Sequence, residues 1–227
     1  MTTKKPIESN SDILPLSNEQ LIADYRLAFR SRQAAIIGRR EVLTGKAKFG
    51  IFGDGKELPQ LAMAHFFRKG DWRSGYYRDQ TWMMAMEHLT LENFFAQLYA
   101  HADPAIERMT GGRNMNGHFS TPLIDENGSW LPQVEMKNSS ADMAPTAAHM
   151  PRTVGLAYAS VLYRHNPLLK QFTSFSRNGD EVVWATIGNA STAQGKFWES
   201  VNAIVVLKAP AIISVYDDGY GISVPNQ

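Results

Sequence analysis

The sequence contains no cysteine, which excludes disulfide bonds, thiolate zinc sites, iron–sulfur clusters and a cysteine nucleophile. It also has little net charge, because 23 Lys and Arg residues against 22 Asp and Glu residues give a formal charge of +1. We therefore expect no nucleic-acid partner, since such proteins use a basic surface field. No hydrophobic run approaches the roughly 20 residues that span a bilayer, so we expect no membrane association. The polar amino terminus lacks a signal-peptide core, and with the missing cysteines this favours a cytoplasmic location.

The remaining composition is that of an ordinary globular protein, with 44% hydrophobic and 20% charged residues among 227. This length predicts one large domain or one and a half. We interpret residues 1–16 as a flexible leader and residues 17–227 as one domain. The domain is expected to be incomplete at its C-terminal end, because a doubly wound sheet would normally continue beyond Tyr216.

Several helices can be predicted from apolar spacing and helix-end signals. The first begins after Ser17, which forms a capping box with Gln20, and ends near Thr44. Others are expected at about 57–68, 79–100 and 151–163, and the Met- and Phe-rich stripe of 79–100 is interpreted as core. Two long loops, 110–119 and about 121–147, are predicted to be functional or disordered.

The last third of the chain predicts a strand, a helix and a second strand. The β-branched run 181–187 is a strand, 192–207 has helical spacing, and 211–216 is another strand. Short connections between these elements imply a right-handed crossover and a parallel sheet. The predicted fold class is therefore α/β, with a parallel sheet flanked by helices.

The ends of these two strands carry polar residues that could bind a ligand. Ligands of open parallel sheets bind outside the carboxyl ends of the strands. Asn189, Asp218 and a main-chain oxygen near Tyr220 would offer oxygen ligands to Mg²⁺, and the N-terminus of the helix near Ser191 would offer N–H groups to a diphosphate. The alternative is that Asn189 caps the helix and Asp217-Asp-Gly219 is an ordinary turn.

The residues at these strand ends also resemble a known family. Gly188-Asn-Ala-Ser, about thirty residues, then Asp217-Asp-Gly-Tyr-Gly-Ile-Ser resembles the thiamine diphosphate motif of 2-oxo acid dehydrogenases, in the alpha subunit of their decarboxylating component. The branched-chain and related bacterial enzymes are the most similar. The resemblance runs from about residue 17 to 227 and includes further motifs in family order: Gly55-Lys-Glu57, Tyr77-Arg-Asp79, Arg113-Asn-Met-Asn-Gly-His118 and Ala144-Pro-Thr-Ala-Ala-His-Met-Pro151.

The resemblance implies a thiamine diphosphate-binding fold and a set of site residues. The implied metal ligands are Asn189, Asp218 and the main-chain oxygen of Tyr220. The implied cofactor-binding residues are Tyr77, Arg78, Ala144, Thr146, Gly188, Ala190, Ser191 and Tyr216. The family usually has Asp or Glu where Asn189 stands and Asn where Asp218 stands. We interpret this as a swapped pair, because the site keeps one carboxylate.

The function that the resemblance implies is thiamine diphosphate- and Mg²⁺-dependent oxidative decarboxylation of a 2-oxo acid, with acyl transfer to lipoamide. The implied partners are a beta subunit or beta-like domain in an alpha2beta2-type assembly, and a lipoyl-bearing acyltransferase. Because the family's activating Glu comes from the beta part, we expect this chain alone to be inactive. The alternatives are a non-catalytic or truncated subunit that keeps the fold, or another thiamine enzyme such as an acetoin dehydrogenase or a transketolase-like protein.

The histidines and one glycine loop complete the candidates. His118 and His149 lie in segments that match the family's active-site approach, and each could face the site or not. The other histidines are expected to face solvent or to be satisfied in the core. The Gly50–Gly55 loop resembles a dinucleotide-binding fingerprint only loosely and follows no convincing strand, so it is discounted.

Overall fold

The computed structural model describes residues 16–225, so the predicted leader lies outside the described residues except for Leu16. No helix in this range is both long and apolar enough to cross a membrane. In chain order the elements are α1 (Asn18–Leu43), α2 (Glu57–Phe66), β1 (Trp72–Ser74), α3 (Gln80–Ala85), α4 (Leu91–Leu98), η1 (Gln133–Glu135), β2 (Asn138–Ser139), α5 (His149–His165), η2 (Pro167–Leu169), β3 (Val183–Gly188), η3 (Asn189–Ala193), α6 (Gly195–Val206), β4 (Ala211–Tyr216), β5 (Tyr220–Gly221) and β6 (Val224–Pro225).

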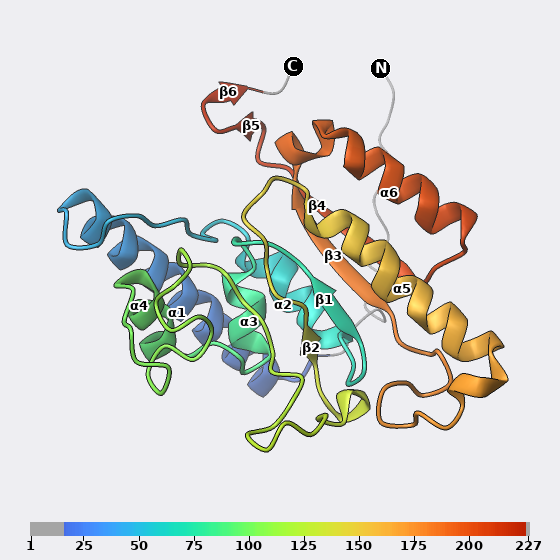
Figure 1. Ribbon diagram of the computed structural model, residues 1–227. Coiled ribbons are helices and arrows are strands. Elements are labelled where there is room, and N and C mark those ends of the chain that lie inside the picture. Colours follow the sequence, from blue (N-terminus) through green and yellow to red (C-terminus); the bar gives the residue numbers. More distant parts are fainter. Residues whose placement is uncertain (1–15, 226–227) are drawn as a thin grey trace, which may run out of the picture.

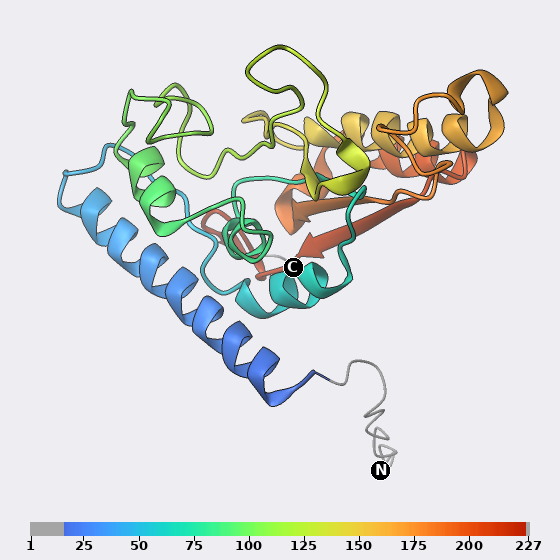
Figure 2. The same cartoon turned by 90° about the horizontal axis from the view of Figure 1, so that it is seen from below.

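The centre of the structure is a parallel sheet with helices on both sides. Its strand order is β2-β1-β3-β4, whereas β5 and β6 form a separate antiparallel hairpin. β3 and β4 pair in register from Val183↔Ala211 to Gly188↔Tyr216, so the two strands end side by side. The helices α5 and α6 lie on one side of the sheet and α2 on the other (Figures 1 and 2). The predicted α/β fold class is confirmed.

Strand β3 shows why the sheet is covered on both faces. Ala185 and Ile187 pack into the apolar cluster formed with α5 and α6. Trp184 points to the opposite face, where its ring lies 6.1 Å from that of Phe67 and 6.2 Å from that of Trp82. Because successive side chains of a strand alternate between faces, a strand buried on both sides is apolar nearly throughout.

The first helix agrees with its sequence signals. Ser17 Oγ accepts a hydrogen bond of 3.2 Å from the backbone N–H of Gln20, whose side chain accepts one of 2.8 Å from the backbone N–H of Ser17. The predicted capping box is therefore confirmed. The helix ends at Leu43, and Gly45 follows in the left-handed region with φ of +76°. A glycine adopts that conformation at little cost, which makes it a good helix terminator.

The helix predicted over 79–100 is two helices, α3 and α4. Glu87 has φ of +64°, which no helix interior allows, and Thr90 caps a new helix by accepting a hydrogen bond of 3.1 Å from Asn93 N–H. Apolar spacing continues across the break, so the pattern alone does not reveal it. The prediction that this stripe forms core is confirmed, since Trp82, Met83 and other residues here are fully buried.

Two further local predictions need correction. The helix predicted from Thr192 begins at Gly195, because the Thr192 hydroxyl donates a 2.6 Å hydrogen bond to the Asn189 carbonyl and holds residues 189–193 in a 3-10 turn. Strands β1 and β2 were not predicted. Both are very short, and β1 carries a buried Arg73 where an apolar residue would have indicated a strand.

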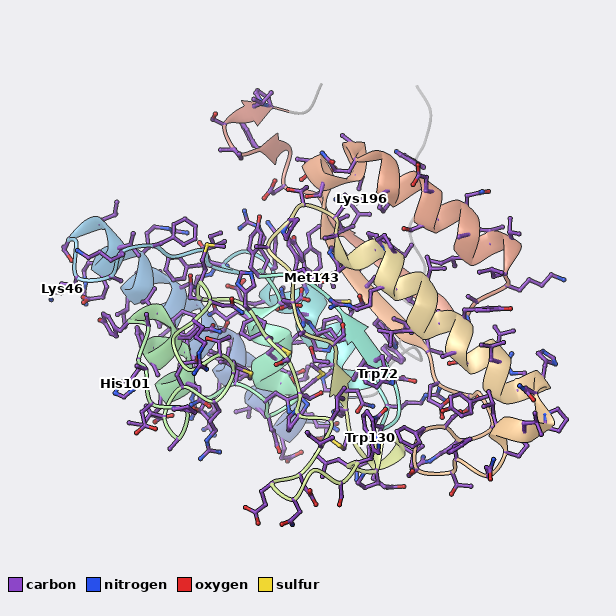
Figure 3. All side chains as sticks on the ribbon, viewed as in Figure 1. Lys46, Trp72, His101, Trp130, Met143 and Lys196 are labelled. Atoms are coloured by element: carbon purple, nitrogen blue, oxygen red, sulfur yellow. The ribbon has the colours of Figure 1, made fainter. Side chains whose placement is uncertain are left out.

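The long loop predicted at about 121–147 has two separate parts in the structure. Trp130, labelled in Figure 3, lies on the 121–131 loop at the opposite end of the view from β5 and β6. Its ring packs on Phe175 with centroids 5.4 Å apart. Loop 140–148, marked by Met143 in Figure 3, instead leads into α5. Of residues 121–147, Thr146 lines the pocket at the strand ends, and the prediction that this loop is functional or disordered stays a prediction.

A fully buried arginine joins the elements around the sheet. Arg73 Nε donates to Asp79 Oδ2 at 2.7 Å, and its two terminal nitrogens donate to both oxygens of Asp142 at 3.0 Å. Further bonds reach Ser139 Oγ at 2.8 Å and the carbonyl of Tyr76 at 3.0 Å. Guanidinium has five N–H donors, and all have acceptors here. Burial would lower the pKa of Arg73, but the carboxylates of Asp142 and Asp79 raise it, so the guanidinium stays charged.

The two carboxylates of this cluster are themselves held by other segments. Asp79 Oδ2 also accepts a 2.6 Å hydrogen bond from the Thr186 hydroxyl on β3. Asp142 Oδ2 accepts one of 3.1 Å from Phe119 N–H, and the ring of Phe119 lies 5.5 Å from the guanidinium of Arg73. The Arg73 cluster, meaning Arg73, Asp79 and Asp142, therefore links β1, β3 and loop 140–148.

Replacing Arg73 with Met is expected to lower the free energy of unfolding by about 3–5 kcal/mol, because two buried carboxylates would lose their counter-ion. Arg177→Met is the control. It breaks the exposed ion pair with Glu135 at 2.7 Å and should cost less than about 1 kcal/mol. Urea unfolding followed by far-UV circular dichroism measures both. Equal losses in the two variants would show that the Arg73 cluster does not hold the fold.

Candidate functional site

A pocket of about 230 Å³ lies at the carboxyl ends of β3 and β4. This is the edge of a parallel sheet at which ligands bind. The volume is below the ~300–1,000 Å³ of complete small-molecule pockets, which fits part of a site. Its lining residues are Tyr76, Tyr77, Arg78, Thr146, Gly188, Asn189, Ala190, Ser191, Tyr216, Asp218, Tyr220, Gly221 and Ile222.

Nearly all the predicted site residues meet in this pocket. Of the predicted cofactor-binding residues, all but Ala144 line it, and so do the predicted metal ligands Asn189, Asp218 and Tyr220. Ala144 lies exposed on loop 140–148, two positions before the lining residue Thr146. The structure thus brings the residues together, while their roles stay predictions.

Arg78 is fixed by the loop that precedes α2. Its Nη1 donates to the Phe52 carbonyl at 3.0 Å, and its own carbonyl accepts from Gln60 Nε2 at 2.7 Å. Gly53 allows this approach, because a Cβ at that position would lie 2.4 Å from the Arg78 carbonyl oxygen. The guanidinium makes no other hydrogen bond within residues 16–225, so its remaining N–H groups are available to an anion.

Asn189 at the end of β3 does not cap a helix. Neither η3 nor α6 has a side-chain cap, and the buried amide nitrogen of Asn189 has no hydrogen-bond partner among the described residues. The alternative that this residue serves as a helix cap is therefore wrong. The N-terminus predicted to begin near Ser191 belongs to the short 3-10 turn, and α6 starts only at Gly195.

The loop after β4 forms turns that orient its acidic residues. Asp217 Oδ1 accepts from Gly219 N–H at 2.9 Å, as expected of an ordinary turn, and Asp218 Oδ1 accepts from Tyr220 N–H at 3.3 Å. Asp218 Oδ2 accepts from Lys56 Nζ at 3.1 Å, and this hydrogen bond is the main reason that the pKa of Asp218 is lowered. Asp218 is therefore a carboxylate that already has a cation beside it.

Strand β5 closes one side of the pocket. A Cβ at Gly221 would lie 2.8 Å from the Cβ of Ala190, so only glycine lets β5 approach η3 this closely. That approach brings Tyr220 beside the turn that carries Asn189. The amide, carboxylate and main-chain oxygens predicted as metal ligands thus come from two turns in contact.

Sequence reasoning missed Tyr76 and Lys56. Tyr76 is buried in the lining, next to the predicted pair Tyr77 and Arg78. It follows β1, and because that strand was not predicted, no sequence pattern indicated that Tyr76 belongs to the site. Burial, followed by the charge of Asp79, raises its pKa, so its hydroxyl is protonated. Lys56 reaches Asp218 across 162 positions of sequence, and no local pattern reports such a contact.

Comparison with known proteins identifies the family. The model of the family described as "Dehydrogenase E1 component" matches residues 26–227. The chain belongs to the dehydrogenase E1 component family. It is 27% identical to the 2-oxoisovalerate dehydrogenase subunit alpha of Bacillus subtilis (strain 168) over 216 residues, which is 93% of this chain and 55% of that protein. It is also 27% identical to the pyruvate dehydrogenase E1 component subunit alpha of Staphylococcus aureus (strain MRSA252) over 220 residues, 95% of this chain and 48% of that protein. The chain spans about half the length of these relatives.

Neither of the two histidines left open in this E1 family chain lines the pocket. The buried His118 has its Nδ1 3.1 Å from the Met115 carbonyl. His149 is buried behind Tyr76, with the two rings stacked at an 8° angle and 6.4 Å apart. Its Nε2 lies 2.9 Å from the Thr186 carbonyl. Within residues 16–225, no group of three or more His, Asp or Glu side chains forms a metal site.

The buried His149 should make stability depend on pH. Burial lowers the pKa of His149 from 6.5 to about 4. Above pH 6.5 the imidazole is neutral in both states. As the pH falls from 6.5 towards 4, the unfolded chain binds a proton that the folded chain does not, so the free energy of unfolding should fall, by an amount on the order of 3 kcal/mol.

Replacing His149 with Gln keeps a donor for the Thr186 carbonyl and removes the titration, so the variant should lose less stability over this pH range. His165→Gln, at the exposed end of the same helix, is the control and should behave as the wild type. Urea midpoints at several pH values measure this. A parallel decline in wild type and His149→Gln would show that His149 is not the group responsible.

Proposed function

We propose that this chain is the alpha-type part of a thiamine diphosphate- and Mg²⁺-dependent 2-oxo acid dehydrogenase, which decarboxylates a 2-oxo acid oxidatively and passes the acyl group to lipoamide. The observation that carries the proposal is the convergence of Arg78, Asn189 and Asp218 on one pocket at the strand ends. Family membership and relatives named as alpha subunits of two 2-oxo acid dehydrogenases support it.

The lining residues fit a diphosphate and a divalent cation. The side-chain oxygens of Asn189 and Asp218 and the main-chain oxygen of Tyr220 are the hard oxygen ligands that Mg²⁺ prefers, with phosphate oxygens completing its coordination. The buried amide nitrogen of Asn189 has no hydrogen-bond partner among the described residues, so no such bond competes with an ion for this side chain. Arg78 offers the planar N–H groups that suit phosphate. Ala190, Ser191 and Thr146 line the remaining walls.

The cofactor, when bound, supplies the electron sink for decarboxylation. The residues of this chain then have positioning tasks. Tyr77 and Arg78 would hold the diphosphate, and the two strand-end turns would fix it through the metal. Asp218 is the only carboxylate among the described lining residues, and it is paired with Lys56. We infer that the group that activates the cofactor comes from a partner, as the family resemblance implies.

We infer that this partner is a beta subunit or beta-like domain in an alpha2beta2-type assembly, which also meets a lipoyl-bearing acyltransferase. The small volume of the pocket supports a site that is shared between two chains or domains. The cytoplasmic location and the domain limits 17–227 stay predictions.

A second candidate function is a subunit that keeps the fold but binds no cofactor. The ion pair between Lys56 and Asp218 favours it, because an ammonium already occupies one oxygen of a predicted metal ligand. Calorimetric titration of the chain with thiamine diphosphate and Mg²⁺ separates the two functions. Saturable, Mg²⁺-dependent binding is expected, and heat indistinguishable from dilution would favour the second candidate.

Replacing Arg78 with Ala removes a charge-assisted contact with the diphosphate worth about 1.5–3 kcal/mol. The dissociation constant for thiamine diphosphate in the presence of Mg²⁺ should therefore rise roughly ten- to a hundredfold. Arg177→Ala, remote from the pocket on an exposed loop, is the control and should bind as the wild type. An unchanged constant for Arg78→Ala would remove it from the diphosphate site.

The swapped ligand pair can be tested by a double-mutant cycle. Asp218→Asn leaves two neutral amides facing the dication, so Mg²⁺-dependent cofactor binding should weaken strongly. Adding Asn189→Asp returns one carboxylate to the site and should recover much of the binding, with a coupling of about 1–3 kcal/mol. Titration calorimetry of the four proteins measures it. Additive losses would show that the two residues do not share an ion.

A further inference from the structure

The floor of the pocket holds two buried phenols. Tyr76 lies just after β1, whereas Tyr216 is the last residue of β4, and they are 7% and 5% exposed. Their ring centroids lie 6.0 Å apart. Burial raises the pKa of Tyr216, and so does the Asp79 carboxylate, which faces the Tyr216 hydroxyl and hydrogen-bonds with it. The Tyr76 hydroxyl has no hydrogen-bond partner within residues 16–225, although Tyr76 lines the pocket. Tyr216 was already predicted to bind the cofactor, whereas no role was predicted for Tyr76.

An unpartnered buried hydroxyl needs an explanation. Burying a hydroxyl without a hydrogen bond costs free energy, and most buried polar groups in proteins are satisfied. Phenylalanine would supply the same ring packing at this position without that cost. The Tyr76 ring is already supported on one side by the parallel ring of His149 and on another by Tyr77, 4.8 Å away. Packing therefore explains the ring of Tyr76 but not its hydroxyl.

The surroundings of the Tyr76 hydroxyl indicate what it contacts. A Cβ at Gly188 would lie 3.5 Å from this oxygen, so the hydroxyl sits beside the start of the turn that carries Asn189. Tyr76 lines the same pocket as Arg78 and Asp218, the charged residues predicted to hold the diphosphate and the metal. The backbone N–H of Tyr76 donates a hydrogen bond of 3.3 Å to Asp79 Oδ2.

We propose that the Tyr76 hydroxyl donates a hydrogen bond to the diphosphate in this pocket, as a binding residue beside Arg78. This inference rests on the proposed function. A phenol O–H is a neutral donor, so it adds a directed contact to an anion without adding another positive charge. The backbone bond from Tyr76 N–H to Asp79 fixes the residue through the Arg73 cluster. The donor is therefore in place before the ligand binds, which reduces the cost of ordering it.

The test is a Tyr76→Phe variant of the full chain, with two probes, thiamine diphosphate and inorganic pyrophosphate, each with Mg²⁺. Titration calorimetry should show the dissociation constants of both probes raised roughly tenfold. The thermal unfolding midpoint without ligand should stay equal or rise, because the substitution removes an unsatisfied polar group. Tyr163→Phe on α5, which lines a different pocket, is the matched control and should change neither constant.

The outcomes separate this inference from the proposed function. If the wild type binds both probes and Tyr76→Phe binds them with unchanged dissociation constants, the role of Tyr76 is overturned while the proposed function stands. A lower unfolding midpoint without ligand would also overturn it, since the hydroxyl would then have a partner inside the fold. If the wild-type chain binds neither thiamine diphosphate nor pyrophosphate, the proposed function is overturned, and with it this inference.

Discussion

The guanidinium of Arg73 holds together the segments from which the pocket is built. It donates hydrogen bonds to Asp79, whose carboxylate also accepts one from the backbone N–H of Tyr76. It also donates to Asp142, which lies on the loop that carries Thr146. Because Asp79 also accepts from Thr186, the position of β3 is coupled to the same charge. An ion cluster that is fully buried contributes little net stability over an apolar core, but losing one partner is costly. The cluster is therefore best understood as fixing the positions of Tyr77, Arg78 and the end of β3.

The charges in the pocket suit an anion accompanied by a cation. Arg78 has N–H groups without partners among the described residues, Lys56 pairs with Asp218, and the amide nitrogen of Asn189 in the same pocket has no partner among them either. In the structure the ammonium of Lys56 is the cation beside Asp218. When Mg²⁺ and a diphosphate bind, Lys56 could remain on one oxygen of Asp218 or turn to the phosphates, and in either case the positive charge stays at the site.

The sequence predicted those features that are determined by residues close together in the chain, and it missed those that depend on distant residues or on a single residue. The capping box of α1 and the β3–α6–β4 unit are encoded by neighbouring residues, and the structure has them. The helix break at Glu87 depends on the positive φ of one residue, and the turn before α6 depends on one hydrogen bond from the Thr192 hydroxyl. The apolar pattern continues through both places, so it does not reveal them. Strand β1 was missed because its buried Arg73 is satisfied by residues far along the chain. Most residues that the resemblance named line one pocket in the structure, but the resemblance left out Tyr76 and Lys56, whose contacts arise only in three dimensions.

The most direct measurement of the central claim is a crystal structure of the chain with thiamine diphosphate and Mn²⁺, whose anomalous scattering locates the ion. The account predicts one ion bound to the side chains of Asn189 and Asp218 and the main-chain oxygen of Tyr220, with the diphosphate against Arg78. An ion or diphosphate bound elsewhere, with this pocket unchanged and Lys56 still the only cation on Asp218, would contradict it.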